Sequence, residues 1–283
     1  MVGGLLFLSI KLYNGFMTET ILYSFLFFIS GSAVGSFLNV VVLRSPNRKS
    51  IVKNRSYCPR CKHELSAFDL IPIWSFLFLR GRCRYCNKKI SWQYPLVEAA
   101  TGIIFLAGFL VLGISLEFFF FMIYASFLIA IFVLDCTKYI IPDFLSVPAG
   151  LSAFLGSIVI TIADLSSPSF HLFPALFSNL GWAILIGGGF FLAQFLISKG
   201  RWVGGGDIRL GAVMGLMLGF PNIIAALGIA YVIGALWGIG LIILKRKTIK
   251  GVLPFGTFLT VSTIICLLWG DEIVKAYLGF IGF

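Results

Sequence analysis

The chain has 283 residues, of which 59% are hydrophobic and only 12% are charged. A soluble domain of this size carries about a quarter charged residues, so the composition excludes an ordinary soluble protein and predicts a polytopic membrane protein. The net charge is +11, and twelve of the 22 Lys and Arg residues lie between Arg44 and Lys89. We interpret these residues as part of a cationic loop on the cytoplasmic side of a bilayer, and we expect no nucleic-acid partner.

The first 42 residues are apolar and contain a single basic residue, Lys11. A secretory signal peptide needs a basic start, which this segment lacks, so we expect an uncleaved membrane span at about 20–43. The partner of this segment is then membrane lipid.

Seven further apolar stretches follow along the chain, and a helix needs about 20 apolar residues to cross a bilayer. Pro221 ends the sixth span, which is short, before the seventh begins. The expected fold class is therefore an all-α polytopic membrane protein with about eight transmembrane helices. The seven further spans are expected at about 95–114, 117–134, 144–163, 174–197, 208–220, 222–244 and 254–270.

Eight spans place the loops alternately on the two sides of the membrane. Of the 22 basic residues, 20 lie in the 44–94 segment, in the other loops on the same side of the membrane, or at Arg209. Because positive residues collect in cytoplasmic loops, we expect this side to be the cytoplasm and both termini to lie outside. If the sixth span failed to cross, the basic 245–253 loop would fall on the opposite side, so the charge pattern favours eight crossings.

The long loop between the first two spans is expected to form a cytoplasmic insert. The chain then divides into a first span at 1–43, the insert at 44–94 and a seven-span core at 95–283. Within the insert, Leu70–Leu79 is apolar but only ten residues long, which is too short to cross a membrane. This segment either packs in the core of the insert or lies on the membrane surface.

Four of the six cysteines form two Cys-x-x-Cys pairs, with 21 residues between the pairs. A tight turn in each pair can point two thiolates at one tetrahedral zinc ion, which is structural when all four ligands are cysteines. Two disulfides are the alternative, but the cytoplasm keeps thiols reduced, so zinc is favoured. The expected ligands are Cys58, Cys61, Cys83 and Cys86.

Four of the eleven acidic residues lie at the cytoplasmic ends of predicted spans. Asp135 and Asp207 each adjoin a long apolar run, and an acid at membrane depth is a functional candidate. Asp207 also follows three glycines at 204–206, which permit positive φ angles and the close approach of another chain. Asp143 and Glu98 have a simpler alternative, as helix-end carboxylates favoured by the helix dipole.

Asp135 and Asp207 come from different spans and are expected to share one reaction. Carboxylates a few Å apart cannot both ionise easily, so the pair holds one proton. The ionised member takes a proton from a water that attacks an amide carbonyl, and the other member donates to the carbonyl oxygen. A run of residues without side chains leaves room for an extended peptide beside the second acid. These residues are Gly204, Gly205 and Gly206.

Several motifs occur in an order that is typical of one known family. The sequence at 204–207 matches the GxGD signature of intramembrane aspartyl proteases. Together with the paired cysteines, the whole set resembles the prepilin peptidases, also called type IV leader peptidases, over most of the chain. The motifs are GSFLNVVVLRSP (35–46), SWQYPLVEAATG (91–102), LDCTKYIIPDFLSVP (134–148), GGGDIRLGAVMGLMLG (204–219) and LPFGTFL (253–259).

The resemblance implies a multi-pass aspartic endopeptidase of the bacterial inner membrane, with its catalytic site and zinc insert on the cytoplasmic side. Its substrates would be prepilins and pseudopilins, which lose a short basic leader by a cut after a glycine at the cytoplasmic membrane face. The catalytic aspartates of the family map onto Asp135 and Asp207. Many members also methylate the new N-terminal residue with S-adenosylmethionine, so we expect this second activity as well.

Three further residues are candidates for substrate binding or methyl transfer. Asp143 could bind the basic leader, whereas Glu98 and Asn39 are polar groups in predicted spans that could belong to the methyl-transfer site. Hydrogen bonding between helices explains the last two nearly as well. The alternative function, in a different class, is a proton-coupled transporter with a zinc-bound regulatory loop. Transporters often contain inverted repeats, and none is evident in this sequence.

Overall fold

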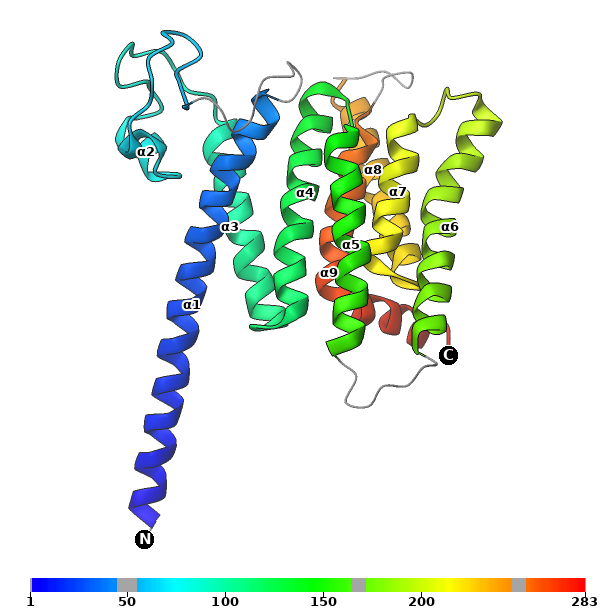
Figure 1. Ribbon diagram of the computed structural model, residues 1–283, viewed down its shortest axis with the longest axis horizontal. Helices are drawn as coiled ribbons and strands as arrows, with labels where there is room; N and C mark the ends of the chain where they lie inside the picture. Colours follow the sequence, from blue (N-terminus) through cyan, green and yellow to red (C-terminus); the bar gives the residue numbers. More distant parts are fainter. Residues whose placement is uncertain (1, 45–54, 164–171, 246–252, 283) are drawn as a thin grey trace. The chain divides into compact units, whose positions relative to one another are not determined.

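The computed structural model describes residues 2–44, 55–163, 172–245 and 253–282, so 45–54 of the expected insert lies outside it. Apart from two isolated β-bridges, the regular structure of these residues is helical (Figure 1). The expected all-α fold is confirmed over this part of the chain. The chain forms two compact units, Met1–Ile114 and Ser115–Phe283.

The first unit is built on two long helices, α1 and α3, that pack through glycines. A Cβ added at Gly35 would lie 2.8 Å from the Cα of Glu98. One added at Gly102 would lie 2.8 Å from the carbonyl oxygen of Phe28. Small residues let helix backbones approach this closely inside a membrane. The elements of this unit are α1 (Val2–Arg44), η2 (Ala67–Leu70), α2 (Trp74–Phe78) and α3 (Gln93–Leu112).

In its described residues, the second unit is a bundle of six helices whose core lies along α4, α7 and α9. Ala125 and Leu128 of α4 and Leu210 of α7 are completely buried. An added Cβ at Gly211 of α7 would meet the backbone of Gly187 in α6, so these two helices also need glycine where they touch. The elements are α4 (Leu116–Lys138), α5 (Asp143–Ala163), α6 (Leu172–Ser198), α7 (Gly205–Leu218), α8 (Asn222–Ile243) and α9 (Phe255–Phe280).

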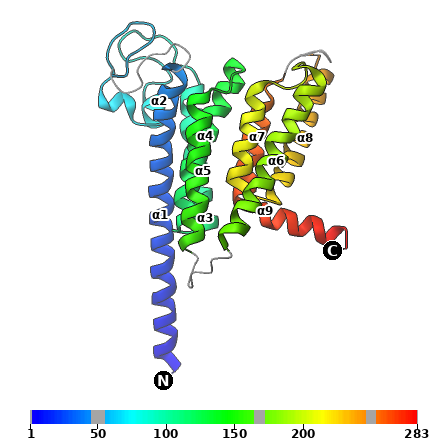
Figure 2. The ribbon, with the colours of Figure 1, turned by 45° about the vertical axis from the view of Figure 1, so that its right-hand side comes forward.

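The helices of the second unit alternate in direction, which brings three particular ends together. The last turn of α4 and the first turns of α7 and α9 lie at one end of this unit (Figure 1). At its opposite end, α9 kinks at Trp269, where φ is −134°, and its last turns run aside from the bundle (Figure 2). Two of these ends carry acids that the sequence singled out, Asp135 on α4 and Asp207 on α7.

Seven helices of the described chain are long and apolar enough to cross a membrane, which makes this a multi-pass membrane protein. The remaining predicted span, at 208–220, corresponds to α7, which has 14 residues and ends at Leu218. At about 1.5 Å per residue, α7 is roughly 21 Å long and so shorter than a hydrocarbon core of about 30 Å. The seven spanning segments are Thr18–Arg44, Gln93–Leu112, Leu116–Lys138, Asp143–Ala163, Ala175–Ser198, Asn222–Ile243 and Phe255–Phe280.

The compact units divide the chain after α3, between Ile114 and Ser115. The sequence instead predicted a division into a first span, an insert and a seven-span core, with boundaries after residues 43 and 94. That division follows the predicted roles of the segments, and it stays a prediction. The difference arises because α3 packs on α1 through its glycines, so the second span belongs structurally with the first span and the insert.

Candidate active site and metal centre

Asp135 lies in the last turn of α4, where only 5% of its surface is exposed. The sequence predicted the span to end at residue 134, but the helix continues to Lys138 and therefore carries Asp135 inside the bundle. Its Oδ2 accepts a hydrogen bond of 2.9 Å from the backbone N–H of Thr257, in the first turn of α9. The first N–H groups of a helix have no partner within it, so this carboxylate caps α9 and is favoured by its dipole.

Gly256 is what allows this contact. A Cβ added there would lie 2.9 Å from Oδ2 of Asp135 and 2.8 Å from Cδ1 of Ile141. Real Cβ atoms do not approach other heavy atoms this closely, so a side chain at this position would push the carboxylate away from α9. The glycine in the LPFGTFL motif therefore has a steric explanation.

Asp207 lies in the first turn of α7 and is half-buried. Its Oδ2 accepts a hydrogen bond of 3.1 Å from the backbone N–H of Gly204, just before the helix. Asp207 therefore caps its own helix with one carboxylate oxygen, while Asp135 caps a neighbouring helix in the same way. The start of α7, which carries Asp207, and the start of α9, which Asp135 caps, both lie against the side chain of Ile141.

The three glycines before Asp207 have different surroundings. A Cβ added at Gly206 would lie 2.9 Å from Cβ of Ile141, whereas one added at Gly205 would meet nothing within 4 Å. Gly204 is extended, with φ −79°, and positive φ is not found at any of the three. The glycine run therefore serves close packing at one position and leaves open space at another, and the positive φ that glycine permits is not used.

Ile141 connects the two acids structurally. The chain turns immediately after α4, because Tyr139 adopts a left-handed conformation with φ 57°. The buried side chain of Ile141 then lies against both Gly206 and Gly256, at the starts of α7 and α9. The residues that follow Asp135 in the LDCTKYIIPD motif thus pack against the start of α7, which carries Asp207, and the start of α9, which Asp135 caps.

Asp143 begins α5, where its carboxylate forms an ion pair with Arg209 in the second turn of α7. Both side chains are partly exposed, at 64% for Asp143 and 46% for Arg209. The sequence suggested that Asp143 is either a helix-end carboxylate or a binder of basic peptide. Its position at the start of α5 fits a helix-end carboxylate. Its partner Arg209 lies two residues after Asp207.

The polar candidates Glu98 and Asn39 lie in the first unit. Oε2 of Glu98 accepts a hydrogen bond of 2.7 Å from the backbone N–H of Ile73, so it connects α3 to the insert. Nδ2 of Asn39 donates to the carbonyl oxygen of Tyr94 at 3.1 Å. Oδ1 of Asn39 is buried and has no hydrogen-bond partner among the described residues. A buried acceptor in this state is a candidate contact for a ligand.

The four predicted zinc ligands converge, since their sulfur atoms all lie within 4.8 Å of one another. Sγ of Cys58 and Sγ of Cys86 are 3.9 Å apart, and all six cysteines are free. Four thiolates about 2.3 Å from one tetrahedral ion would lie roughly 3.8 Å apart, so the cluster fits a single zinc. Two disulfides would require two pairs of sulfurs at bonding distance, which these cysteines do not form.

The two cysteine pairs are held by matching turns. The N–H of Cys58 donates to the carbonyl of His63, and that of Cys83 to the carbonyl of Lys88, both at 2.9 Å. In each turn the residue four positions after the first cysteine has positive φ, at 62° for Lys62 and 55° for Asn87. Each pair is therefore a tight loop that points two sulfurs inward.

The electrostatics of the insert favour a thiolate at Cys58, but not at Cys86, whose pKa is raised to about 11, and they favour an ionised Asp69. Burial raises the pKa of Cys58, but backbone hydrogen bonds from Cys61 and Arg60 outweigh it and lower this pKa to about 7, toward the thiolate that binds metal. Burial likewise opposes ionisation of Asp69, but hydrogen bonds from Arg84 and Ser66 lower its pKa below the usual value. The ionised Asp69 accepts from Nε of Arg84 at 2.7 Å and so stabilises the second knuckle.

The fold and these contacts define a class: a multi-pass membrane protein with two carboxylates at one end of a helix bundle and a cluster of four cysteines in its first unit. Residues 29–112 match the bacterial peptidase A24 N-terminal domain, and residues 122–239 match the type IV leader peptidase family. The chain belongs to the type IV leader peptidase family. Each matched region lies within one of the two compact units, and the second ends before α9.

Curated relatives agree over most of the chain. The chain is 37% identical to a prepilin leader peptidase/N-methyltransferase of Bacillus subtilis, over 89% of this chain and 96% of the relative. It is 31% identical to proteins of the same name from Aeromonas salmonicida, over 91% and 94%, and Pseudomonas aeruginosa, over 89% and 92%. No solved structure matches the chain. The transporter alternative is not supported by these relatives.

Sequence reasoning did not identify four residues around the acid pair, although they fall in or beside the quoted motifs. Thr257 contacts Asp135 across 122 positions of sequence, which no local pattern indicates. The isolated glycine of LPFGTFL and the basic residue two positions after Asp207 were visible signals. The four residues are Ile141, Arg209, Gly256 and Thr257.

Proposed function

We propose that the chain is a membrane aspartic endopeptidase that removes the basic leader of type IV prepilins and related pseudopilins by a cut after a glycine. The observation that carries the proposal is the gathering of Asp135 and Asp207 at one end of the second unit. The names of the curated relatives support it, since each is a prepilin leader peptidase/N-methyltransferase.

In this proposal Asp135 and Asp207 hold one proton between them. The ionised carboxylate takes a proton from water as the water oxygen bonds to the scissile carbonyl carbon, and the protonated carboxylate gives its proton to the carbonyl oxygen. Return of a proton to the amide nitrogen breaks the C–N bond and releases the leader. The hydrogen bonds from Thr257 and Gly204 orient one oxygen of each carboxylate and prepare the pair for this exchange.

The open space at Gly205 supports a peptide substrate. A scissile segment must be extended beside the acids, and an added Cβ at Gly205 would meet nothing within 4 Å. A prepilin has a basic leader followed by an apolar helix, so its scissile bond lies at the inner membrane boundary. The clustering of basic residues in the loops supports a cytoplasmic location for this end and for the insert, in the bacterial inner membrane.

The second activity in this proposal is N-methylation of the newly exposed residue, for which S-adenosylmethionine supplies the methyl group. The names of the relatives support it. Asn39 is a candidate contact for the donor, because its buried Oδ1 lacks a partner among the described residues. Glu98 and Asp143 are weaker candidates, since each is already engaged, by Ile73 and by Arg209 respectively.

The four-cysteine cluster is proposed to hold one structural zinc. Cys58, Cys61, Cys83 and Cys86 would hold it. When bound, the ion joins the two knuckles and stabilises a segment that has little apolar core of its own.

A cleavage assay tests the proposal. Purified protein in detergent is incubated with a prepilin-like peptide and S-adenosylmethionine, and the products are weighed by mass spectrometry. Asp135→Asn and Asp207→Asn each keep the side-chain size but lose the shared proton, so each should slow cleavage by about 100-fold or more. Retained cleavage in either variant would remove that residue from the mechanism.

The same assay separates the two activities and the two functional classes. The parent protein should yield a shortened peptide whose mass exceeds that of the unmethylated cleavage product by one methyl group. A cleavage product without this added mass would show that the protein is a peptidase without methyltransferase activity. A parent protein that leaves the peptide intact would favour the transporter class instead.

A further inference from the structure

The apolar segment Leu70–Leu79 in the insert does not form the insert's core. Of its ten residues only Phe76 is buried, and it packs on Trp92 with ring centroids 4.9 Å apart. The neighbouring large side chains are exposed, at 60% for Trp74, 56% for Leu77 and 81% for Phe78. The sequence allowed this segment either to pack in the core of the insert or to lie on the membrane surface. In the structure, most of its apolar surface is not covered by the first unit.

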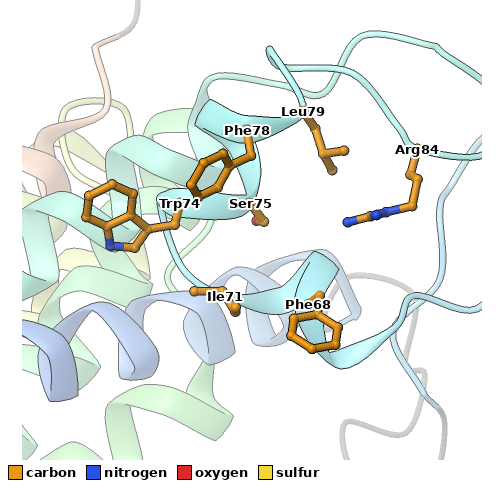
Figure 3. Close-up of a pocket in the computed structure, with 7 residues that line it drawn as sticks. All are labelled: Phe68, Ile71, Trp74, Ser75, Phe78, Leu79 and Arg84. Carbon is orange, nitrogen blue, oxygen red and sulfur yellow. The ribbon is translucent and has the colours of Figure 1, made fainter.

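These exposed residues gather around a shallow cavity of about 330 Å³ (Figure 3). Trp74 and Phe78 line it from α2, and Phe68, which is 73% exposed, lines it from η2. The remaining lining residues are Ile71, Ser75, Leu79 and Arg84. Nε of Arg84 is used by Asp69, but a guanidinium carries five N–H donors, so it can also bind an anion.

A hydrogen bond attaches the start of α2, and with it this surface, to a defined point along the length of α3. Ile73, immediately before α2, donates its N–H to Glu98, in the second turn of α3. α3 has 20 residues, so it needs nearly its whole length to cross a hydrocarbon core of about 30 Å. The start of α2 is therefore held at the depth where α3 enters the membrane, rather than out in the water.

We infer that Leu70–Leu79 and Phe68 form a lipid-binding surface that inserts into the leaflet in which α3 begins. Leu96, near the start of α3, is also exposed, at 61%. The charge of the insert fits the headgroups of anionic phospholipids, because residues 55–89 contain eight Lys and Arg residues against two acids. An interfacial element of this kind sits about 5–10 Å into the boundary between headgroups and acyl chains.

Spin labels on the full chain in vesicles of phosphatidylethanolamine and phosphatidylglycerol test this inference. A nitroxide is attached through an unnatural amino acid at Phe78 and, in a second variant, at Trp74. Ile103, which is 57% exposed on the spanning part of α3, is the lipid reference, and the exposed Lys88 of the second knuckle is the water reference. Collision with dissolved oxygen reports lipid, and collision with a water-soluble nickel chelate reports water.

Labels at Phe78 and Trp74 should resemble the label at Ile103, with high oxygen and low nickel collision, and give a depth of about 5–10 Å. Two results would overturn the inference: strong nickel collision at both sites, as at Lys88, or exclusion of both reagents, which would mean that protein covers the surface. The measurement uses no substrate, so it stands or falls separately from the peptidase assignment.

Discussion

Gly256 determines where the carboxylate of Asp135 can lie. The carboxylate reaches the N–H of Thr257 only because no Cβ stands between α4 and the first turn of α9. At the scale of single residues, the site therefore depends on an absent side chain as much as on the acid. An acid placed by its contact with a helix end is pre-organised, which catalysis requires.

Gly256→Ala should therefore impair cleavage while the helix still forms, because alanine itself favours helix. The added methyl group pushes Asp135 off the end of α9, and a loss of about 1.4 kcal/mol in transition-state stabilisation lowers kcat/KM by about tenfold. Gly279→Ala, in the same helix, is the matched control, since its Cβ would meet nothing within 4 Å. Equal kcat/KM in both variants would contradict this role of Gly256.

The glycine run offers a second comparison between neighbours. Gly206→Ala places a Cβ against the branched Cβ of Ile141, which cannot swing away, so overpacking should cost about 1–3 kcal/mol and lower Tm. Gly205→Ala points into open space and should leave Tm unchanged. If a substrate backbone occupies the open space beside Gly205, Gly205→Ala should raise KM. Thermal unfolding and steady-state kinetics measure both, and equal Tm values would disprove the packing difference.

At the scale of elements, the two knuckles of the insert meet at their four sulfurs and at the rings of His63 and Tyr85, whose centroids are 3.7 Å apart. Metal analysis should find about one zinc per chain, because one tetrahedral ion takes four thiolates. Cys58→Ser combined with Cys83→Ser removes the two buried ligands, one from each knuckle, and should abolish binding. Cys136→Ser with Cys266→Ser is the control, as neither belongs to the cluster. Zinc that persists in the first double variant would refute the assignment of all four ligands.

The sequence predicted those features that depend on local pattern. Hydrophobic length located the spans, and Cys-x-x-Cys spacing located the cysteine cluster, because both signals lie in short stretches of the chain. It could not predict that Asp135 caps α9, since the partner lies 122 positions away. The position of Leu70–Leu79 also stayed open, because an apolar run alone does not say whether protein or lipid covers it.

At the scale of the whole molecule, α7 is shorter than the hydrocarbon core that a membrane-spanning helix has to cross. Its 14 residues span only about 21 Å, but Leu210 and Met214 are completely buried and the helix packs against α5, α6 and α9. A helix covered by protein along its middle need not match the full thickness of the lipid, because a neighbouring helix can satisfy the backbone beyond its end, as Asn179 of α6 does for the N–H and the carbonyl of Phe220. We therefore expect α7 to count as a crossing.

Reporter fusions after residue 283 decide this count. If α7 crosses, seven crossings separate the C-terminus from the insert, so the two lie on opposite sides of the membrane. A C-terminal alkaline phosphatase should then be active and a C-terminal green fluorescent protein dark, while a fluorescent protein inserted after Lys88 should fluoresce. If α7 does not cross, only six crossings remain and the C-terminal phosphatase should be inactive. That result would also place the basic residue Lys245 outside, against the tendency of positive charge to stay in the cytoplasm.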